Sequence, residues 1–169
     1  SGSASTTNDN FGRVLGRYAN GQKLLGQDVW KTYSLNGSGG TVSFEFQRFD
    51  SWDDGEQFYV YANDTQILAS VYRYYDNITD SRSGNSNGYS WTITPISANT
   101  RSGHLDNDAW TVQRFRVTIN VPLSVTTLKL GFGSSLNGEL WDESYAIDNV
   151  SVINPSVAIT RAPDWVDNS

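Results

Sequence analysis

Period-two alternation of apolar and polar residues is the feature that most constrains the fold of this chain. In residues 41–49 it places Val42, Phe44 and Phe46 on one face and polar side chains on the other. No segment carries the helical pattern over three turns. The pattern therefore predicts an all-β, two-sheet antiparallel β-sandwich, for which we favour a jelly roll. The expected strands are residues 29–35, 41–49, 57–62, 67–75, 89–93, 113–121, 126–132 and 146–153.

One segment interrupts the regular spacing of these strands. Residues 76–110 are rich in Asn, Ser, Asp and Gly, with only the short run 89–93 typical of a strand. We interpret the segment as one long loop insertion, which on a rigid sandwich is commonly functional. We expect the sandwich to span residues 10–153, with a linker at 1–9 and a tail or linker at 154–169.

Charge and composition exclude several classes of protein. The 12 basic and 18 acidic side chains give a net charge of −6, which leaves no cationic surplus to neutralise nucleic-acid phosphates. No apolar run is long enough for a transmembrane helix, so we expect no direct membrane insertion. Cysteine is absent, so the fold has no disulfide and no thiolate metal site. An extracellular domain without disulfides often needs another stabilising element, and the composition of this chain suggests bound calcium.

The densest acidic cluster lies at residues 50–56, between two expected strands. Asp50, Asp53, Asp54 and Glu56 would repel one another in the folded state unless a positive charge lay among them. Ca²⁺ binds six to eight oxygen atoms, and a short turn of carboxylates and carbonyls suits it. The alternative is a solvated hairpin turn, in which Asp-Asp-Gly is ordinary.

A second acidic cluster precedes and enters the last expected strand. It contains Asp142, Glu143 and Asp148, and Asp148 is flanked by apolar neighbours. A carboxylate in a half-buried strand needs a partner. A cation shared with Asp142 or Glu143 would supply one, and we favour this over an arginine. The candidate arginines are Arg13, Arg17 and Arg48.

A third group follows His104, the only histidine. Asp106 and Asp108 match one fragment of a calcium loop, without the rest of an EF-hand. We interpret His104 as a loop residue rather than a zinc ligand.

Four motifs together resemble a known family. They are GRVLGRY at 12–18, VWKTY at 29–33, FDSWD at 49–53 and DESYAIDNV at 142–150. They are similar to the calcium-dependent peptide-binding domain of bacterial repeats-in-toxin (RTX) adhesins of the Vibrio and Marinomonas type. The resemblance implies an extracellular, cell-surface domain of a larger secreted adhesin that mediates adhesion or biofilm formation. It also implies a calcium-stabilised fold that holds a peptide, often a protein C-terminus on another cell, with Ca²⁺ coordinating its carboxylate.

The residues themselves leave the class of ligand open. No nucleophile elbow, metalloprotease motif or Cys–His pair occurs, so we expect a binding module and not an enzyme. The six Trp and nine Tyr residues could stack on sugar rings, which makes a calcium-dependent, lectin-like glycan-binding module the main alternative. Trp52, Trp91 and Trp110 could instead fill the core. A purely structural, calcium-rigidified spacer is the third possibility.

We expect the ligand to bind at residues 76–110. Tyr89 and Trp91 would form apolar walls, and Arg82 or Arg101 would pair with a carboxylate. The remaining expected contacts are Trp110 and a calcium ion held by Asp106 and Asp108 with open coordination positions. The alternative is an acidic loop in water that binds nothing.

Overall fold

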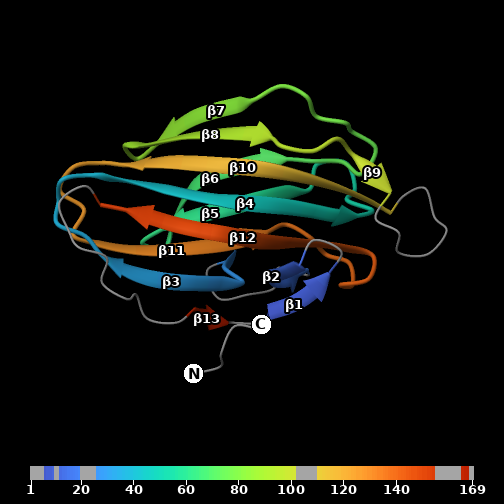
Figure 1. The fold of residues 1–169 in the computed structure, drawn as a ribbon, viewed down its shortest axis with the longest axis horizontal. Helices are drawn as coiled ribbons and strands as arrows, with labels where there is room; N and C mark the ends of the chain where they lie inside the picture. The colour runs from blue at the N-terminus through green and yellow to red at the C-terminus, as the bar shows by residue number, and fades with distance from the viewer. Residues whose placement is uncertain (1–5, 10–11, 20–25, 102–109, 155–164, 168–169) are drawn as a thin grey trace.

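The computed structural model describes residues 6–9, 12–19, 26–101, 110–154 and 165–167. Two antiparallel sheets pack face to face, which confirms the predicted sandwich (Figure 1). The described residues contain no α-helix.

The larger sheet has eight strands in the order β1-β2-β12-β4-β10-β8-β7, with β9 paired to β10. The longest strands, β4, β10 and β12, are adjacent and form its centre. Its members are β1 (Thr6–Asp9), β2 (Gly12–Tyr18), β4 (Gly40–Asp50), β7 (Arg82–Ser86), β8 (Tyr89–Pro95), β9 (Thr100–Arg101), β10 (Thr111–Val121) and β12 (Glu143–Ile153).

The smaller sheet has five strands in the order β13-β3-β11-β5-β6. Its members are β3 (Val29–Ser34), β5 (Gln57–Ala62), β6 (Thr65–Val71), β11 (Thr127–Ser134) and β13 (Val166–Asp167). The β5–β6 turn is tight because Asn63 and Asp64 both have positive φ angles, 50° and 65°, as the common two-residue hairpin turn requires.

The strand order is that of a jelly roll. Four strands, β2-β12-β4-β10, face four others, β3-β11-β5-β6, and the chain crosses repeatedly between the two sheets. The β7–β8 hairpin is inserted between β6 and β10 and extends the larger sheet beside β10.

The core lies between the two inner faces, as the alternation predicted. Val42, Phe44 and Phe46 of β4 are at most 1% exposed. Phe46 stacks on Phe58 of the opposite sheet, with ring centroids 4.1 Å apart. Aromatic pairs of this kind stabilise a core beyond the area that they bury.

The structure differs from the sequence-based organisation in three places. The segment 76–110 is not one continuous loop, because the β7–β8 hairpin and β9 occupy part of it. Part of the expected leading linker forms β1, which pairs with β2. At the other terminus Val166 and Asp167 pair with β3, so this part of the tail lies against the smaller sheet.

Four connections meet at one end of the sandwich, which we call the loop end. They are residues 51–56, 72–81, 96–99 and 135–142. Backbone hydrogen bonds join them: Tyr74 N donates to Trp52 O, and Ser51 N donates to Asp142 O. In Figure 1 this end is on the right, where β4 ends, β12 begins and β9 lies.

Candidate functional site

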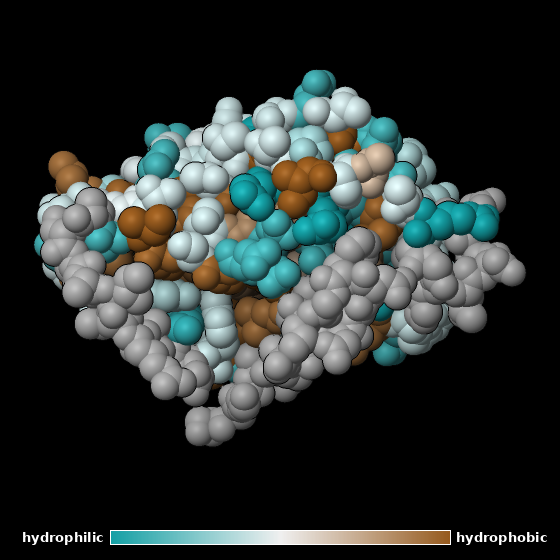
Figure 2. All heavy atoms as spheres, in the orientation of Figure 1, coloured by the Kyte–Doolittle hydropathy of each residue, from teal (hydrophilic) through white to brown (hydrophobic). Residues whose placement is uncertain are grey.

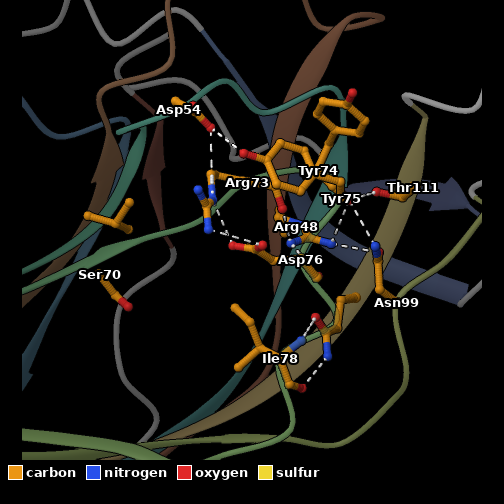
Figure 3. Close-up of polar contacts among 12 residues, drawn as sticks. Arg48, Asp54, Ser70, Arg73, Tyr74, Tyr75, Asp76, Ile78, Asn99 and Thr111 are labelled. Carbon is orange, nitrogen blue, oxygen red and sulfur yellow. Dashed lines mark hydrogen bonds and ion pairs between the residues drawn. The ribbon is translucent and has the colours of Figure 1, made fainter.

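A buried arginine organises the loop end. Arg48 follows Phe44 and Phe46 on the inner face of β4 and is 0% exposed. Its guanidinium donates to Arg73 O (2.5 Å), Asp76 O (3.4 Å) and Tyr74 O (3.5 Å), and to Oδ1 of Asn99 (2.6 Å) (Figure 3). None of these four acceptors is a carboxylate. Burial accordingly lowers the pKa of Arg48 to about 10, although the group stays charged at neutral pH.

Three further polar side chains fix the same loops. Asn99 donates from Nδ2 to Tyr74 O, and Thr111 donates from Oγ1 to the same carbonyl. Gln113 is 0% exposed and bonds both backbone groups of Ile78: Oε1 accepts from N (3.1 Å) and Nε2 donates to O (2.7 Å). Hydrogen bonds from these side chains therefore fix the backbone of the loop end.

A cavity of about 420 Å³ lies between two of these held segments, residues 77–79 and 95–98. Both belong to the stretch in which the sequence predicted ligand binding. None of the residues that line it is one of the predicted ligand contacts, and ligand binding in this stretch stays a prediction.

Two acidic residues, Glu56 of the first predicted cluster and Glu143 of the second, meet in the structure. Glu56 and Glu143 are 6% and 1% exposed, and their carboxyl groups hydrogen-bond to each other. Burial, followed by this hydrogen bond and the charge of Glu143, raises the pKa of Glu56 to about 8. Oε1 of Glu143 also accepts from the backbone amides of Asn137 and Gly138. Among the described residues no donor other than a proton shared with Glu143 reaches Oε1 of Glu56.

Asp50 and Asp142 do not join this pair. Asp50 is 0% exposed and forms an ion pair with Arg17, with 2.8 Å between Nη2 and Oδ2. Asp142 accepts at Oδ1 from the hydroxyl of Ser51 (2.5 Å). Both carboxylates therefore already have partners that hold the ends of β4 and β12 together.

Asp53 and Asp54 lie exposed in the turn of residues 51–56. The backbone amide of Asp53 donates to Oε2 of Glu56 (2.6 Å), and Oδ1 of Asp54 accepts from the hydroxyl of Tyr75 (2.8 Å). Both residues belong to a solvent-exposed turn, and calcium binding by them stays a prediction.

Asp148 is half-buried, as expected, and the partner that the structure gives its carboxylate is a backbone amide. Its Oδ1 accepts from the backbone amide of Asn149 (2.7 Å), at an irregularity where the β12–β4 register shifts and Asn149 has a φ of 52°. The Asp148 carboxylate thus provides an acceptor for a backbone amide at this irregularity in β12.

Three of the predicted ligand contacts have structural positions instead. Tyr89, 7% exposed, belongs to the core, and Trp91 packs against it from the same face of β8. Arg82 donates to Ser70 Oγ (2.7 Å) and Val71 O (2.6 Å) and joins the adjacent edges of the two sheets. The parity of residues 89, 91 and 93 was the signal that Tyr89 and Trp91 share the buried face of Ile93.

Two more of the predicted contacts, Arg101 and Trp110, lie near the loop end. Arg101 is exposed on β9, while Trp110 is 8% exposed and meets Trp141 edge to face, with ring centroids 6.4 Å apart. Asp106, Asp108 and His104 lie outside the described residues. Sequence reasoning missed the roles of Arg48, Asn99 and Gln113, although the in-phase position of Arg48 after Phe44 and Phe46 was a signal.

The Glu56–Glu143 pair has the chemistry of a partial calcium site. Two buried carboxylates need a proton or a cation between them, and Ca²⁺ prefers carboxylate and carbonyl oxygens. Within the described ranges, no three His, Cys, Asp or Glu side chains come together as a metal site. Other ligands of an ion at this pair would have to be backbone carbonyls, neutral side chains or water.

The outer surface gives no broad apolar face in the view of Figure 2. Apolar side chains form small groups separated by polar ones there. The most exposed large apolar residues near the loop end are Tyr75 (52%), Leu140 (51%) and Trp141 (57%). No helix within the described ranges is long and apolar enough to cross a membrane.

In comparisons with protein-family models, curated proteins and solved structures, none matched this chain.

Proposed function

We propose that this chain is a calcium-stabilised ligand-binding module of a bacterial surface adhesin, which binds a peptide at its loop end. The observation that carries the proposal is the buried Glu56–Glu143 pair, in which burial and the neighbouring Glu143 raise the pKa of Glu56, so that ionisation of both carboxyl groups would place two negative charges side by side. Ca²⁺ in place of the shared proton would relieve this repulsion. Glu56 and Glu143 would hold the ion, which would supply positive charge at the base of the loop end.

Ca²⁺ binding at the Glu56–Glu143 pair would affect the ligand-binding loops through a short series of hydrogen bonds. Glu56 O accepts from Tyr72 N, and Trp52 O accepts from Tyr74 N. Tyr74 O is in turn a shared acceptor of Arg48, Asn99 and Thr111. The calcium dependence of ligand binding would follow from this physical continuity.

The RTX-adhesin resemblance supports peptide over other ligands, with a free C-terminus as the expected form, and an extracellular, cell-surface location. A glycan is the second candidate, because the exposed rings of Tyr75 and Trp141 could stack on sugars. We propose binding rather than catalysis, since the buried polar groups of the loop end bond mostly to backbone.

Parallel screens test the proposal. The calcium-loaded protein is applied to a library of C-terminal peptides and to a glycan array, each repeated with excess chelator, and peptide hits are resynthesised as C-terminal amides. We expect peptide hits that require calcium and lose affinity on amidation. Glycan hits alone would favour the second candidate, and no hit on either would favour a structural spacer.

A further inference from the structure

The larger sheet ends in a strand whose outer side has no strand partner. β7 (Arg82–Ser86) is antiparallel to β8, and no other strand of the described residues pairs with it (Figure 1). Its pairing with β8 has no register shift, and it contains neither proline nor lysine. The edge strands β1 and β6 each pair through a register shift, and β13 has only two residues. β7 therefore lacks the bulge, proline and lysine by which many edge strands avoid pairing with other chains.

The hairpin turn determines which backbone groups of β7 point outward. Residues 87–88 form a two-residue turn between β7 and β8, with φ angles of 51° and 82°. The two residues that flank such a turn exchange both backbone hydrogen bonds, and this exchange repeats at every second residue of the strand. The backbone N–H and C=O groups of Ser83 and Asn85 therefore point away from β8. Their spacing matches the backbone of one further extended strand.

The inner face of β7 carries an aromatic surface that a further strand would reach. The indole ring of Trp91 lies over Gly84, in the space that a Cβ atom would occupy, and Trp91 is only half-buried. In a strand added to β7, the residue opposite Gly84 would form a non-hydrogen-bonded pair with it. In such pairs the side chains of the paired residues lie closest together. An apolar side chain at this place would pack beside the indole ring.

Arg82 adds a charge preference at the start of β7. Its Nη1 atom donates to Ser70 and Val71, and its guanidinium lies 4.9 Å from the ring centroid of Tyr72. Within the described chain no carboxylate pairs with Arg82, and its Nε and Nη2 atoms have no acceptor. A carboxylate in the added strand opposite Arg82, two residues from the side chain beside Trp91, would therefore complete an ion pair.

We propose that the β7 edge, meaning the outward backbone of Arg82–Ser86, binds an extended acidic segment of another protein as an added antiparallel strand. Backbone hydrogen bonds to Ser83 and Asn85 provide the affinity, and the side chains opposite Gly84 and Arg82 provide the specificity. The site goes beyond the proposed function, because it uses no group of the loop end and needs no calcium.

A second copy of this chain is a poorer partner for the same edge. Two antiparallel β7 strands paired about Gly84 would place a glycine beside the indole ring, where no side chain could pack. They would also place Ser86 opposite Arg82, so the guanidinium would gain no carboxylate. The composition of β7 therefore favours a different, acidic segment as the occupant.

A designed peptide tests the proposal. In acetyl-Thr-Ile-Thr-Phe-Thr-Glu-Thr-amide, antiparallel pairing places the phenylalanine opposite Gly84 and the glutamate opposite Arg82. Titrated into protein with a ¹⁵N-labelled backbone, it should shift the amide signals of Ser83 and Asn85 in a saturable way and slow their hydrogen exchange. Glutamine in place of the glutamate should weaken the peptide about threefold, as expected for a partly exposed ion pair. Absence of saturable shifts at both amides, or equal affinity of the two peptides, would overturn the proposal.

Methylated peptides separate strand addition from other modes of contact. The amides of the two threonines that flank the phenylalanine point toward β7 and donate to Ser83 O and Asn85 O. Methylation of both should abolish saturable binding, because it removes these donors. Methylation of the phenylalanine amide, which points away from β7, should leave the affinity nearly unchanged. Equal loss from the two methylations would contradict strand pairing.

Protein variants at one outward position supply the second control. Asn85→Pro removes an N–H group that faces away from β8 and so spares the β7–β8 hydrogen bonds, whereas Asn85→Thr keeps it. The proline variant should weaken the peptide roughly tenfold, and the threonine variant should not. Equal affinity of the two variants would overturn the assignment. Concentration-dependent shifts of Ser83 and Asn85 without peptide, together with a dimer in sedimentation, would also overturn it in favour of a second copy.

Discussion

At the scale of single residues, the loop end contains two kinds of buried ionisable group. Arg48 is a buried cation that is balanced by the dipoles of carbonyl and amide oxygens. Glu56 and Glu143 are buried acids that are balanced only by a shared proton in the absence of a cation. The two terminal nitrogens of Arg48 have acceptors within the protein, whereas the two acids can be neutralised only by a proton or an added cation.

The pKa of Glu56 predicts how the stability of the metal-free protein varies with pH. Its pKa rises from 4.5 to about 8 on folding, so the folded state binds this proton more tightly than the unfolded state. The stabilisation is complete below about pH 4.5 and is lost as the pH rises through about 8. In denaturant unfolding with chelator, the contribution of Glu56 to the free energy of unfolding should therefore decline between about pH 4.5 and about pH 8. Glu56→Gln should remove this pH dependence. Parallel pH profiles for the two proteins would contradict this.

Replacement of Arg48 should destabilise the fold strongly. Arg48→Met removes a donor from three carbonyls and the Asn99 amide oxygen, of which Tyr74 O and Arg73 O keep other donors, and we expect a loss of about 3 kcal/mol in the free energy of unfolding. Arg116→Met is the matched control, because the Arg116 side chain is 56% exposed and pairs only with Glu45. Its cost should stay below about 1 kcal/mol. Similar costs in urea unfolding would show that Arg48 is not essential to the loop end.

At the scale of elements, alternation located the central strands well. It identified the buried faces of β4, β10 and β11, because each has at least three large apolar residues in phase. It missed β7, β1 and β9, whose sequences have no apolar residue, and β13, which has only two residues. It also missed β2, where Val14 and Leu15 are adjacent and do not alternate with polar residues. Those strands depend on pairing with neighbours, which no local pattern records.

The candidate site was predictable only in part, for a related physical reason. The two acidic clusters were visible in the sequence, but only the antiparallel pairing of β4 with β12 brings Glu56 and Glu143 together while Asp50 takes Arg17. Sequence spacing could not separate these partners. Arg48 and Gln113 hold the loop end mainly through hydrogen bonds to backbone carbonyls that are distant in the sequence. Every residue has a backbone carbonyl, so the sequence does not indicate which ones are the partners.

The β7–β8 hairpin provides a test at the same scale. Gly84 of β7 lies beneath Trp91, and a Cβ atom there would come within 2.4 Å of the indole ring. Gly84→Val should therefore cost about 1–3 kcal/mol through overpacking. Ser83→Val, at the adjacent exposed position of β7, should change the stability by no more than about 0.5 kcal/mol. Thermal unfolding of both variants checks this, and equal melting temperatures would mean that Trp91 moves aside freely.

At the scale of the whole molecule, the jelly roll presents the groups of the proposed function at one end. The segment of the carboxyl pair is linked to the acceptors of the buried arginine by backbone hydrogen bonds from Tyr72 N to Glu56 O and from Tyr74 N to Trp52 O. An ion that binds only the folded state stabilises it by about 2.7 kcal/mol at a hundredfold excess over its Kd. Calcium should therefore stabilise the whole sandwich as well as the loop end.

Calorimetric titration of Ca²⁺ into verified metal-free protein tests the central claim most directly. We predict binding that releases protons near pH 7, because Glu56 must lose its proton to the buffer. Glu143→Gln should abolish this binding and the accompanying rise in melting temperature, whereas Glu139→Gln, at an exposed position of the same loop, should retain both. No binding by the unmodified protein, or equal binding by the two variants, would contradict the account.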